Sequence, residues 1–305
     1  MEENQNNKQL EVKLDSHRRK AAFAKIVTYG AGAMMILFLM TGMIPIMLVF
    51  LVIALAGGYQ MSKHTEKLKK TLSDNIVSSV LNEVFDGVEY NPFGHIPDRL
   101  ISAAGMDFSF DYDRIYGSDY IKGTYKGLQV ELSDVELSQT QPEYNEDMQK
   151  TGESEQKVFD GQWLICDFGK ELSGEVHISE NTRSQRRRHK KDRIEMENAG
   201  FNERFIVTAG NSQEAYYILT PHMMEYILSA AGKSGGVVYM AFLRDGKLHI
   251  AVQTGRDFFE LGKSGSNVEL LRQKFLGELQ WFTDIIDELR VEENIYKKEM
   301  APFPD

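Results

Sequence analysis

Residues 26–61 contain no Asp, Glu, Lys or Arg, although charged residues make up 26% of the chain. As a single α-helix this run would extend about 54 Å, far beyond a hydrocarbon core of about 30 Å. Helices in the core of a soluble protein rarely stay uncharged over such a length, so a buried hairpin is disfavoured. The apolar region is also too long for a cleaved signal peptide. The missing charge therefore favours two antiparallel membrane helices.

The expected turn lies at residues 41–45, where Gly42 permits a reversal and Pro45 suits the first turn of a second helix. Each leg is short, because about 14 residues, or roughly 20 Å of helix, separate each flanking tyrosine from the turn. Full crossing and a re-entrant hairpin both remain open. The tyrosines are expected at the membrane interface and the small residues where the helices approach each other. The predicted anchor residues are Tyr29, Gly30, Gly32, Gly42, Pro45, Gly57, Gly58 and Tyr59.

Basic residues flank the uncharged run on both sides. Excess Lys and Arg mark cytoplasmic segments, so the sequence predicts a bacterial cytoplasmic membrane protein with both termini in the cytoplasm. The lipid bilayer is then one partner. The flanking cations, called the basic collar below, are Arg18, Arg19, Lys20, Lys25, Lys63, Lys67, Lys69 and Lys70.

Cysteine is almost absent, and this absence limits the chemistry. A single cysteine, Cys166, excludes an internal disulfide and agrees with a reducing, cytoplasmic setting. The seven histidines are scattered, and none has a second His or a Cys at metal-ligand spacing. We therefore predict no metal and no cofactor.

No catalytic motif withstands inspection. Residues 232–236, Gly-Lys-Ser-Gly-Gly, match the letters of the G-x-S-x-G nucleophile elbow. That chemistry needs a strand before the serine and a helix after it. Here a predicted helix comes first and a strand follows, so the residues are better explained as a helix end and turn. We predict no catalytic residue, and the pattern favours a protein that is not an enzyme.

The charge is unevenly distributed. The net charge is -10, and the residues after position 70 are strongly acidic. An acidic soluble part argues against nucleic-acid binding. One basic run interrupts it and lacks an aromatic residue on which a base could stack. A plain loop or partner contact, an anionic membrane surface and nucleic acid all remain open for it. Its cations are Arg183, Arg186, Arg187, Arg188, Lys190, Lys191 and Arg193.

The pattern predicts an α+β protein: an N-terminal transmembrane helical hairpin, then a cytoplasmic domain with an antiparallel β-sheet, packed helices and a long C-terminal helix. A polar and basic tail spans 1–25, the hairpin 26–61, an amphipathic connecting helix 62–87, and the soluble domain 88–305. The soluble domain is either a single unit or a pair of subdomains, 106–180 and 201–291.

Local signals give a finer prediction. Alternating apolar residues predict strands from position 106 onward. Residues 138–156 show no apolar periodicity and are expected to form a long exposed loop. Thr220 and Pro221 are typical of a helix start, and Asn267 is expected to cap the long terminal helix. Residues 201–207 and 258–261 are read as strands, and residues 1–9 as disordered.

From residue 201 onward the amino-acid sequence resembles a known family. The segments FNERFIVTAGNSQEAYYILTPHMMEYI, FLRDGKLHIAV and FFEL carry the resemblance, together with the upstream VFDGQWLICDFGKELSGEVHI. They resemble an uncharacterised bacterial membrane family, domain of unknown function 3137. The resemblance implies a membrane-anchored cytoplasmic domain and brings no activity or catalytic residues.

Three functions are consistent with these patterns. The first is a membrane-anchored binding or scaffold protein that contacts a protein partner or a second copy of itself. The second is an enzyme, such as a hydrolase, presented at the membrane with a site that the sequence does not reveal. The third is a sensor of anionic lipid that acts through residues 183–193.

Overall fold

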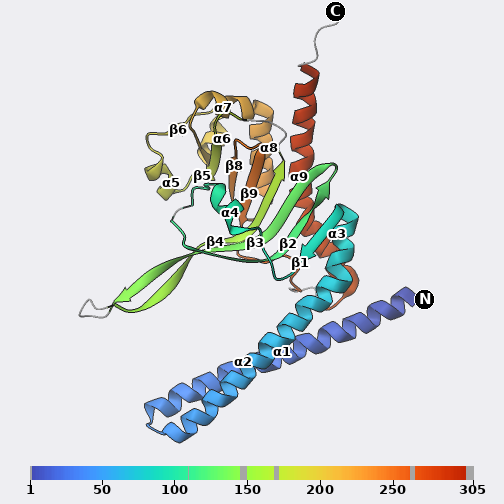
Figure 1. Ribbon diagram of the computed structural model, residues 1–305, viewed down its shortest axis with the longest axis vertical. Coiled ribbons are helices and arrows are strands. Elements are labelled where there is room, and N and C mark those ends of the chain that lie inside the picture. The colour runs from blue at the N-terminus through green and yellow to red at the C-terminus, as the bar shows by residue number, and fades with distance from the viewer. Residues whose placement is uncertain (1, 109, 145–149, 168–171, 262–264, 300–305) are drawn as a thin grey trace, which may run out of the picture. The chain divides into compact units, whose positions relative to one another are not determined.

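The computed structural model describes residues 2–108, 110–144, 150–167, 172–261 and 265–299. The chain divides into two units (Figure 1). The first unit comprises residues 1–81 and 259–276, and the second comprises residues 82–258 and 277–305. The protein is α+β, as predicted, with two apolar N-terminal helices, an antiparallel sheet and a long C-terminal helix.

The first unit is built on a helical hairpin. Helix α1 spans Glu2–Met40 and helix α2 spans Ile44–Leu72. A π-helical turn, Ser73–Val77, follows α2 and leads into α3, Ser78–Val84. The hydroxyl of Ser78 donates to the carbonyl of Ser73 at 2.7 Å across this wider turn.

The disorder predicted for residues 1–9 is wrong for the described part, because α1 begins at Glu2. Leu14 is fully buried, and a carboxylate oxygen of Glu11 accepts a hydrogen bond from the Val268 amide at 3.1 Å. The helix thus begins just before a part of α1 that makes contacts within the first unit. Sequence composition did not indicate them, because the partner lies about 250 residues away along the chain.

The second unit is organised around a nine-stranded sheet, with strand order β1-β2-β3-β4-β9-β8-β5-β7-β6 among the described residues. The pairings between neighbouring strands are all antiparallel. The strands are β1 Asp86–Asn91, β2 Arg114–Tyr125, β3 Leu128–Tyr144, β4 Lys150–Asp167, β5 Val176–Glu180, β6 Arg193–Ile194, β7 Phe205–Ala209, β8 Val237–Phe242 and β9 Lys247–Gln253.

Strands from residues 106–180 and 201–291 share this sheet, and β9 and β8 lie between β4 and β5. Strand β4 pairs with β9, in register from Gln162↔Val252 to Asp167↔Lys247, and β5 pairs with both β7 and β8. The helices of this unit, among the described residues, are α4 Asp98–Ala103, α5 Arg183–Arg188, α6 Ala199–Arg204, α7 Ser212–Ile218 and α8 Pro221–Lys233. Helix α9, Val268–Glu299, begins in the first unit and continues into the second from residue 277.

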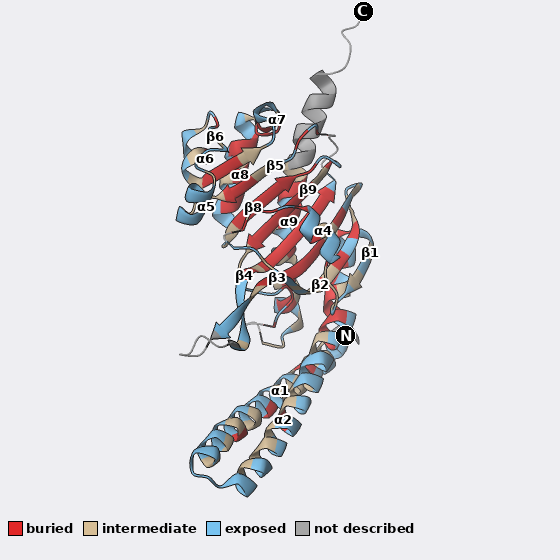
Figure 2. Ribbon diagram, turned by 60° about the vertical axis from the view of Figure 1, so that its left-hand side comes forward, coloured by how far each residue is buried: buried red, intermediate tan, exposed pale blue. Residues whose placement is uncertain are grey.

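The core of this unit lies against the central strands, which are coloured as buried in Figure 2. On one face, Phe108, Phe159, Trp163 and Tyr239 form an aromatic cluster, with ring centroids 4.8 Å apart for Phe108 and Tyr239. Helix α4 contributes Ile101 to this cluster. Helices α8 and α9 contact each other in this unit, where the Trp281 indole donates to the Ala230 carbonyl at 2.9 Å.

Two local helix signals are confirmed. The Thr220 hydroxyl caps α8 by accepting from the Met223 amide at 3.2 Å, and Pro221 occupies the first turn. Asn267 caps α9 through a bond from the Leu270 amide at 2.9 Å. Strands β8 and β9 form an antiparallel hairpin.

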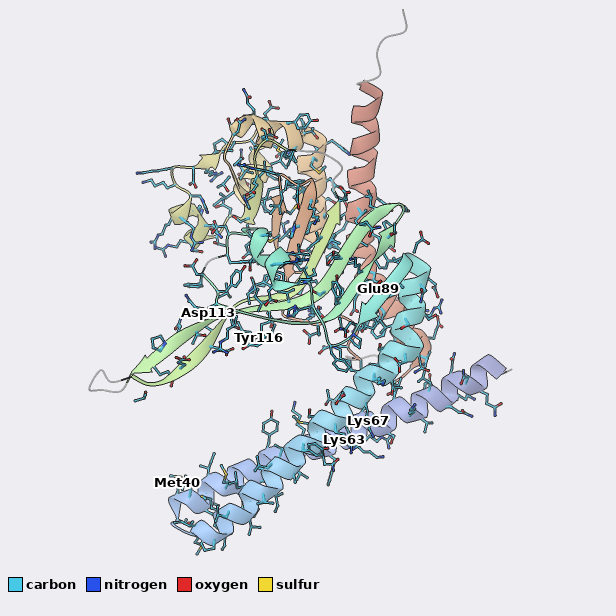
Figure 3. The ribbon with its side chains drawn as sticks, in the orientation of Figure 1. Met40, Lys63, Lys67, Glu89, Asp113 and Tyr116 are labelled. Carbon is cyan, nitrogen blue, oxygen red and sulfur yellow. The ribbon has the colours of Figure 1, made fainter. Side chains whose placement is uncertain are left out.

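The exposed loop predicted at 138–156 is wrong for most of its length, because β3 continues to Tyr144 and β4 begins at Lys150. Residues 145–149 lie outside the described residues. The two strands extend past the sheet as a ribbon, called the β3–β4 arm (residues 139–144 and 150–157), with Asp113 and Tyr116 near its base (Figures 1 and 3). Both faces of the arm are polar, so it lacks the alternation by which a half-buried strand is recognised.

Three shorter assignments also need correction. Residues 201–204 belong to helix α6, and the strand begins at Phe205. Residues 258–261 form no strand, and the described part of 106–112 is likewise irregular. In each case aromatic residues gave the strand signal, but they are buried as core contacts of turns and a helix: Phe108, Phe201, Phe258 and Phe259.

Candidate membrane anchor and basic surface

The reversal between α1 and α2 is set by local backbone chemistry. Gly42 has a positive φ of 72°, which favours glycine, and Pro45 lies in the first turn of α2. The Met43 amide donates to the Phe38 carbonyl at 3.0 Å, and the Gly42 amide donates to the Leu39 carbonyl at 3.2 Å. This pair of bonds is a Schellman motif, which satisfies the last carbonyls of α1.

The hairpin exposes its apolar side chains. Among the described helices, two ranges are long and apolar enough to cross a membrane: Gln5–Met40 and Ile44–Val84. In the most apolar 18-residue stretch of each, 11% and 6% of the residues are buried. Figure 2 shows the same helices as mainly exposed or intermediate. A core helix of a soluble protein would bury such a surface. The exposed apolar side chains of the run include Ile26, Leu37, Leu39, Met40, Ile44, Leu48, Val49, Val52 and Leu55.

The two helices contact each other through one small residue in particular. A Cβ placed on Gly57 would lie 2.6 Å from the Thr28 hydroxyl oxygen, so glycine permits this approach. Gly58 lies at the edge of the same contact, whereas a Cβ on Gly30 or Gly32 would meet nothing within 4 Å. Nearer the turn, the rings of Phe38 and Phe50 stack with centroids 5.5 Å apart.

Tyr29 and Tyr59 flank the charge-free run and are both about two-thirds exposed. The Lys25 ammonium lies 5.9 Å from the Tyr29 ring centroid, and the Lys63 ammonium lies 5.9 Å from that of Tyr59. Figure 3 shows Met40 at the tip of the hairpin and Lys63 and Lys67 farther along α2. An apolar tip, then aromatic residues, then cations is the order expected across a membrane interface.

The basic run lies in the second unit and is not a plain loop. Residues Arg183–Arg188 form α5, capped by the Thr182 hydroxyl, which accepts from the Gln185 amide at 3.3 Å. A plain loop, one of the alternatives left open for this run, does not describe residues 183–188, because α5 packs through Gln185, which is almost fully buried and donates to the Asp107 carbonyl.

Asp107 joins the basic run to the segment before β2. Its carboxylate forms ion pairs with Arg188 and His189, and Arg188 also donates to the Phe108 carbonyl at 2.6 Å. The other ring nitrogen of His189 lies 3.0 Å from Asp192. Burial of the ring opposes its charged form, but the hydrogen bonds to Asp192 and Asp107 outweigh burial and raise the pKa of His189.

The other cations of the run face solvent. The ion pairs among the described residues do not involve Arg183, Arg186, Arg187, Lys190 or Lys191, and all five side chains are exposed. Arg193 is half-buried, and it donates to the Asn202 carbonyl at 2.9 Å and pairs with Glu195. Five of the seven predicted cations are therefore available to an anionic partner.

A cavity of about 400 Å³ beside Asp107 brings titratable groups together and was not apparent from the sequence. His177 and His189 both line it. Both nitrogens of His189 are engaged by carboxylates, which leaves no free nitrogen to act as a base. Burial lowers the pKa of His177. The described lining contains no Ser or Cys, so it offers only Thr208 as an aliphatic hydroxyl and no thiol nucleophile.

Ser234 lacks the surroundings of a catalytic serine. Its hydroxyl lies 2.9 Å from the Ala231 carbonyl and 3.0 Å from the Gly236 carbonyl, in the turn that ends α8. The adjacent cavity, about 230 Å³, has no histidine in its described lining. Within the described residues no group of three His, Cys, Asp or Glu side chains is placed to hold a metal ion. Burial raises the pKa of the Cys166 thiol to about 12, which keeps it protonated and unreactive.

Comparisons with known proteins give one family and one distant structure. Residues 157–291 match the model of a family described as "Protein of unknown function (DUF3137)". No curated protein matches the chain. A crystal structure of the mycobacterial trehalose monomycolate transport factor A is similar at 10% identity, covering 60% of this chain and 92% of that one, with a TM-score of 0.29. That score is too low to indicate a shared fold.

Proposed function

We propose that this chain, whose residues 157–291 belong to the DUF3137 family, is a membrane-anchored binding or scaffold protein of a bacterial cytoplasmic membrane. The α1–α2 hairpin enters the bilayer from the cytoplasm, and both termini stay on that side. The second unit then contacts a partner protein or a second copy of the chain.

One observation carries the proposal: the hairpin presents an exposed, charge-free surface bounded by tyrosines and cations on both legs. Water would exclude such a surface, whereas a bilayer would accept it. Basic residues flank both ends, so both ends are expected on the same, cytoplasmic side. Within residues 26–61 the chain has no ionisable Asp, Glu, Lys or Arg to relay an ion, which argues against transport.

Topology is tested by labelling single cysteines with a membrane-impermeant maleimide in oriented vesicles. Lys8→Cys and Ser212→Cys should react from the cytoplasmic face alone, while buried Cys166 provides a low background. Thr41→Cys reports on the turn: labelling from the opposite face indicates full crossing, and no labelling from either face indicates a re-entrant hairpin. Reaction of Lys8→Cys and Ser212→Cys from opposite faces would refute the proposed topology.

The exposed cations of the basic run support a second candidate function, sensing of an anionic membrane surface. Each Lys or Arg side chain near an anionic leaflet contributes roughly 1 kcal/mol to the binding free energy. Salt screens this attraction. If the run lies on the leaflet, trypsin should cleave residues 183–191 more slowly as the phosphatidylglycerol content of the vesicles rises. Equal cleavage rates in phosphatidylglycerol and phosphatidylcholine vesicles would exclude this role.

A further inference from the structure

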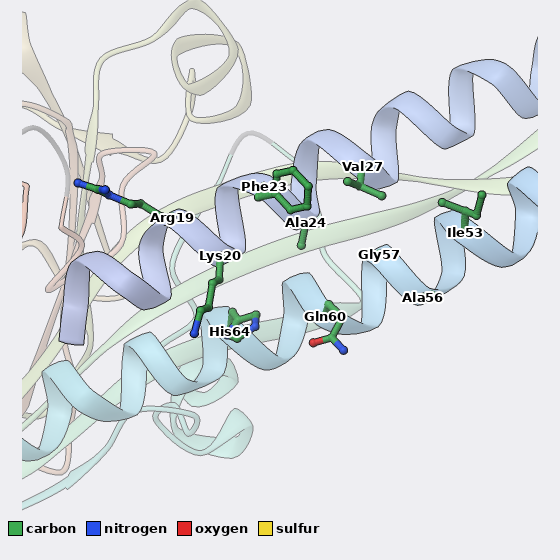
Figure 4. Close-up of a pocket in the computed structure, with 10 residues that line it drawn as sticks. All are labelled: Arg19, Lys20, Phe23, Ala24, Val27, Ile53, Ala56, Gly57, Gln60 and His64. Atoms are coloured by element: carbon green, nitrogen blue, oxygen red, sulfur yellow. The ribbon is translucent and has the colours of Figure 1, made fainter. Parts of the chain in front are cut away.

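A groove of about 560 Å³ runs between α1 and α2 where the charge-free run meets the basic collar (Figure 4). Its volume is in the range of ligand pockets, roughly 300–1,000 Å³. The groove lies within the first unit, and its lining side chains come from one face of each helix. It therefore depends on the pairing of the two helices rather than on either helix alone.

The apolar part of the groove is lined by both small and large residues. The small residues are Ala24, Ala56 and Gly57, and the larger ones include Phe23 and Ile53. The close approach of Gly57 to Thr28 fixes the separation of the helices. An open apolar groove between two exposed helices suits a hydrocarbon chain better than a polar ligand.

The other end of the groove is cationic. Arg19 and Lys20 come from α1 and His64 from α2, and the described lining contains no acidic residue. Arg19 also pairs with Asp15 at 2.7 Å, but both side chains are exposed, and such a pair exchanges readily for another anion. The Nδ1 atom of His64 is buried and has no hydrogen-bond partner among the described residues.

We propose that this groove binds one anionic phospholipid, with an acyl chain along its apolar lining and the phosphate at the cationic end formed by Arg19, Lys20 and His64. This inference rests on insertion of the hairpin into a bilayer. The charge pattern favours a lipid over a second copy of the hairpin, because another hairpin would bring its own basic collar against this one. It also favours an anionic headgroup over a zwitterionic one.

The test uses the full-length chain, purified in detergent and mixed with equal amounts of dioleoyl phosphatidylglycerol and dioleoyl phosphatidylcholine. Native mass spectrometry counts the lipids retained. One phosphatidylglycerol per chain should remain in preference to phosphatidylcholine. Arg19→Gln with Lys20→Gln should weaken retention by roughly tenfold or more, because each cation near an anionic group contributes about a factor of five.

The matched control is Arg18→Gln with Lys25→Gln, which removes the same charge from the same collar outside the groove. It should retain the lipid as the wild type does. Ala56→Leu should displace the lipid by filling the groove, whereas Ala22→Leu, exposed on α1 outside the groove, should not. Equal loss in the two double variants, or equal retention of both lipids, would overturn the proposal.

Two further outcomes are informative. Flotation with phosphatidylcholine vesicles measures insertion alone: wild-type chain that floats but shows no lipid preference refutes the groove and leaves the anchor intact. Chain that fails to float refutes both. A dimer in the mass spectrum that Ala56→Leu abolishes would assign the groove to a second copy instead.

Discussion

His249 is a buried titratable group whose protonation should control stability in acid. It is 1% exposed, and the Trp163 indole donates to its Nδ1 atom at 3.2 Å, so the ring is held in its neutral form. Burial lowers the pKa of His249 to about 4. The unfolded chain binds this proton near pH 6.5, and the folded chain binds it only near pH 4.

Neutral His249 should therefore contribute fully to the free energy of unfolding above pH 6.5. The free energy of unfolding should fall as the pH drops toward 4, and this residue should account for up to about 3 kcal/mol of the decrease. His249→Gln keeps an acceptor for the indole and removes the titration, so its stability should depend less on pH over this interval. Denaturant unfolding of both proteins at a series of pH values measures the difference. Parallel pH profiles would show that His249 is not the group responsible.

Gly57 is the second residue with a sharp structural role. Gly57→Leu places a side chain against Thr28, and overpacking of this kind typically costs about 1–3 kcal/mol. The helices should separate, and a cysteine pair at Phe38 and Phe50, introduced in a Cys166→Ala background, should form its disulfide less efficiently. Gly30→Leu is the matched control, because it meets nothing within 4 Å. A similar loss of cross-linking in both variants would contradict the assigned contact.

At the scale of elements, the β3–β4 arm stands apart from the core. Its strands pair with each other, while the ladders to β2 and β9 stop at Ser138 and Gln162. The described arm residues are polar and mainly exposed. Its ordered pairing therefore comes from backbone hydrogen bonds rather than from apolar burial.

Replacing residues 141–154 with Asn-Gly should close the shortened hairpin at the Thr140↔Glu155 pair. The melting temperature should change by less than about 2 °C, since no core contact is lost. Leu137→Ala, in the buried part of the same strand, should instead cost about 2–5 kcal/mol. Thermal unfolding measures the melting temperature of both variants. If the shortened chain lost as much stability as Leu137→Ala, the arm would be part of the core.

At the scale of the whole molecule, the charge distribution should govern how the chain meets a membrane. The collar attracts an anionic leaflet, and the acidic remainder of the chain, with its excess of Asp and Glu, is repelled by it. Attraction at the collar acts before insertion, and apolar burial holds the hairpin afterwards.

Insertion into phosphatidylglycerol vesicles should be faster than into phosphatidylcholine vesicles at about 0.05 M salt, and the difference should vanish near 1 M salt. Salt added after insertion should not release the chain. Flotation at timed intervals measures both effects. Release by salt alone would mean that the hairpin binds the surface without entering it.

The sequence determined the features that depend on near neighbours. A long charge-free run specifies apolar helices, and Gly42 with Pro45 specifies the break, because backbone geometry there is decided within a few residues. The same holds for the caps at Thr220 and Asn267, whose side chains bond to amides three residues away. The α+β class followed from the same periodicities.

Tertiary structure decided what depends on distant partners. The β3–β4 arm has no apolar alternation to reveal it, and its strands are held by pairing across the hairpin. The docking of α5 rests on Asp107, about 80 residues earlier, whose partners no local pattern identifies. The groove exists because particular faces of α1 and α2 meet at Thr28 and Gly57. Helical periodicity predicts that faces exist, but only packing selects which of them touch.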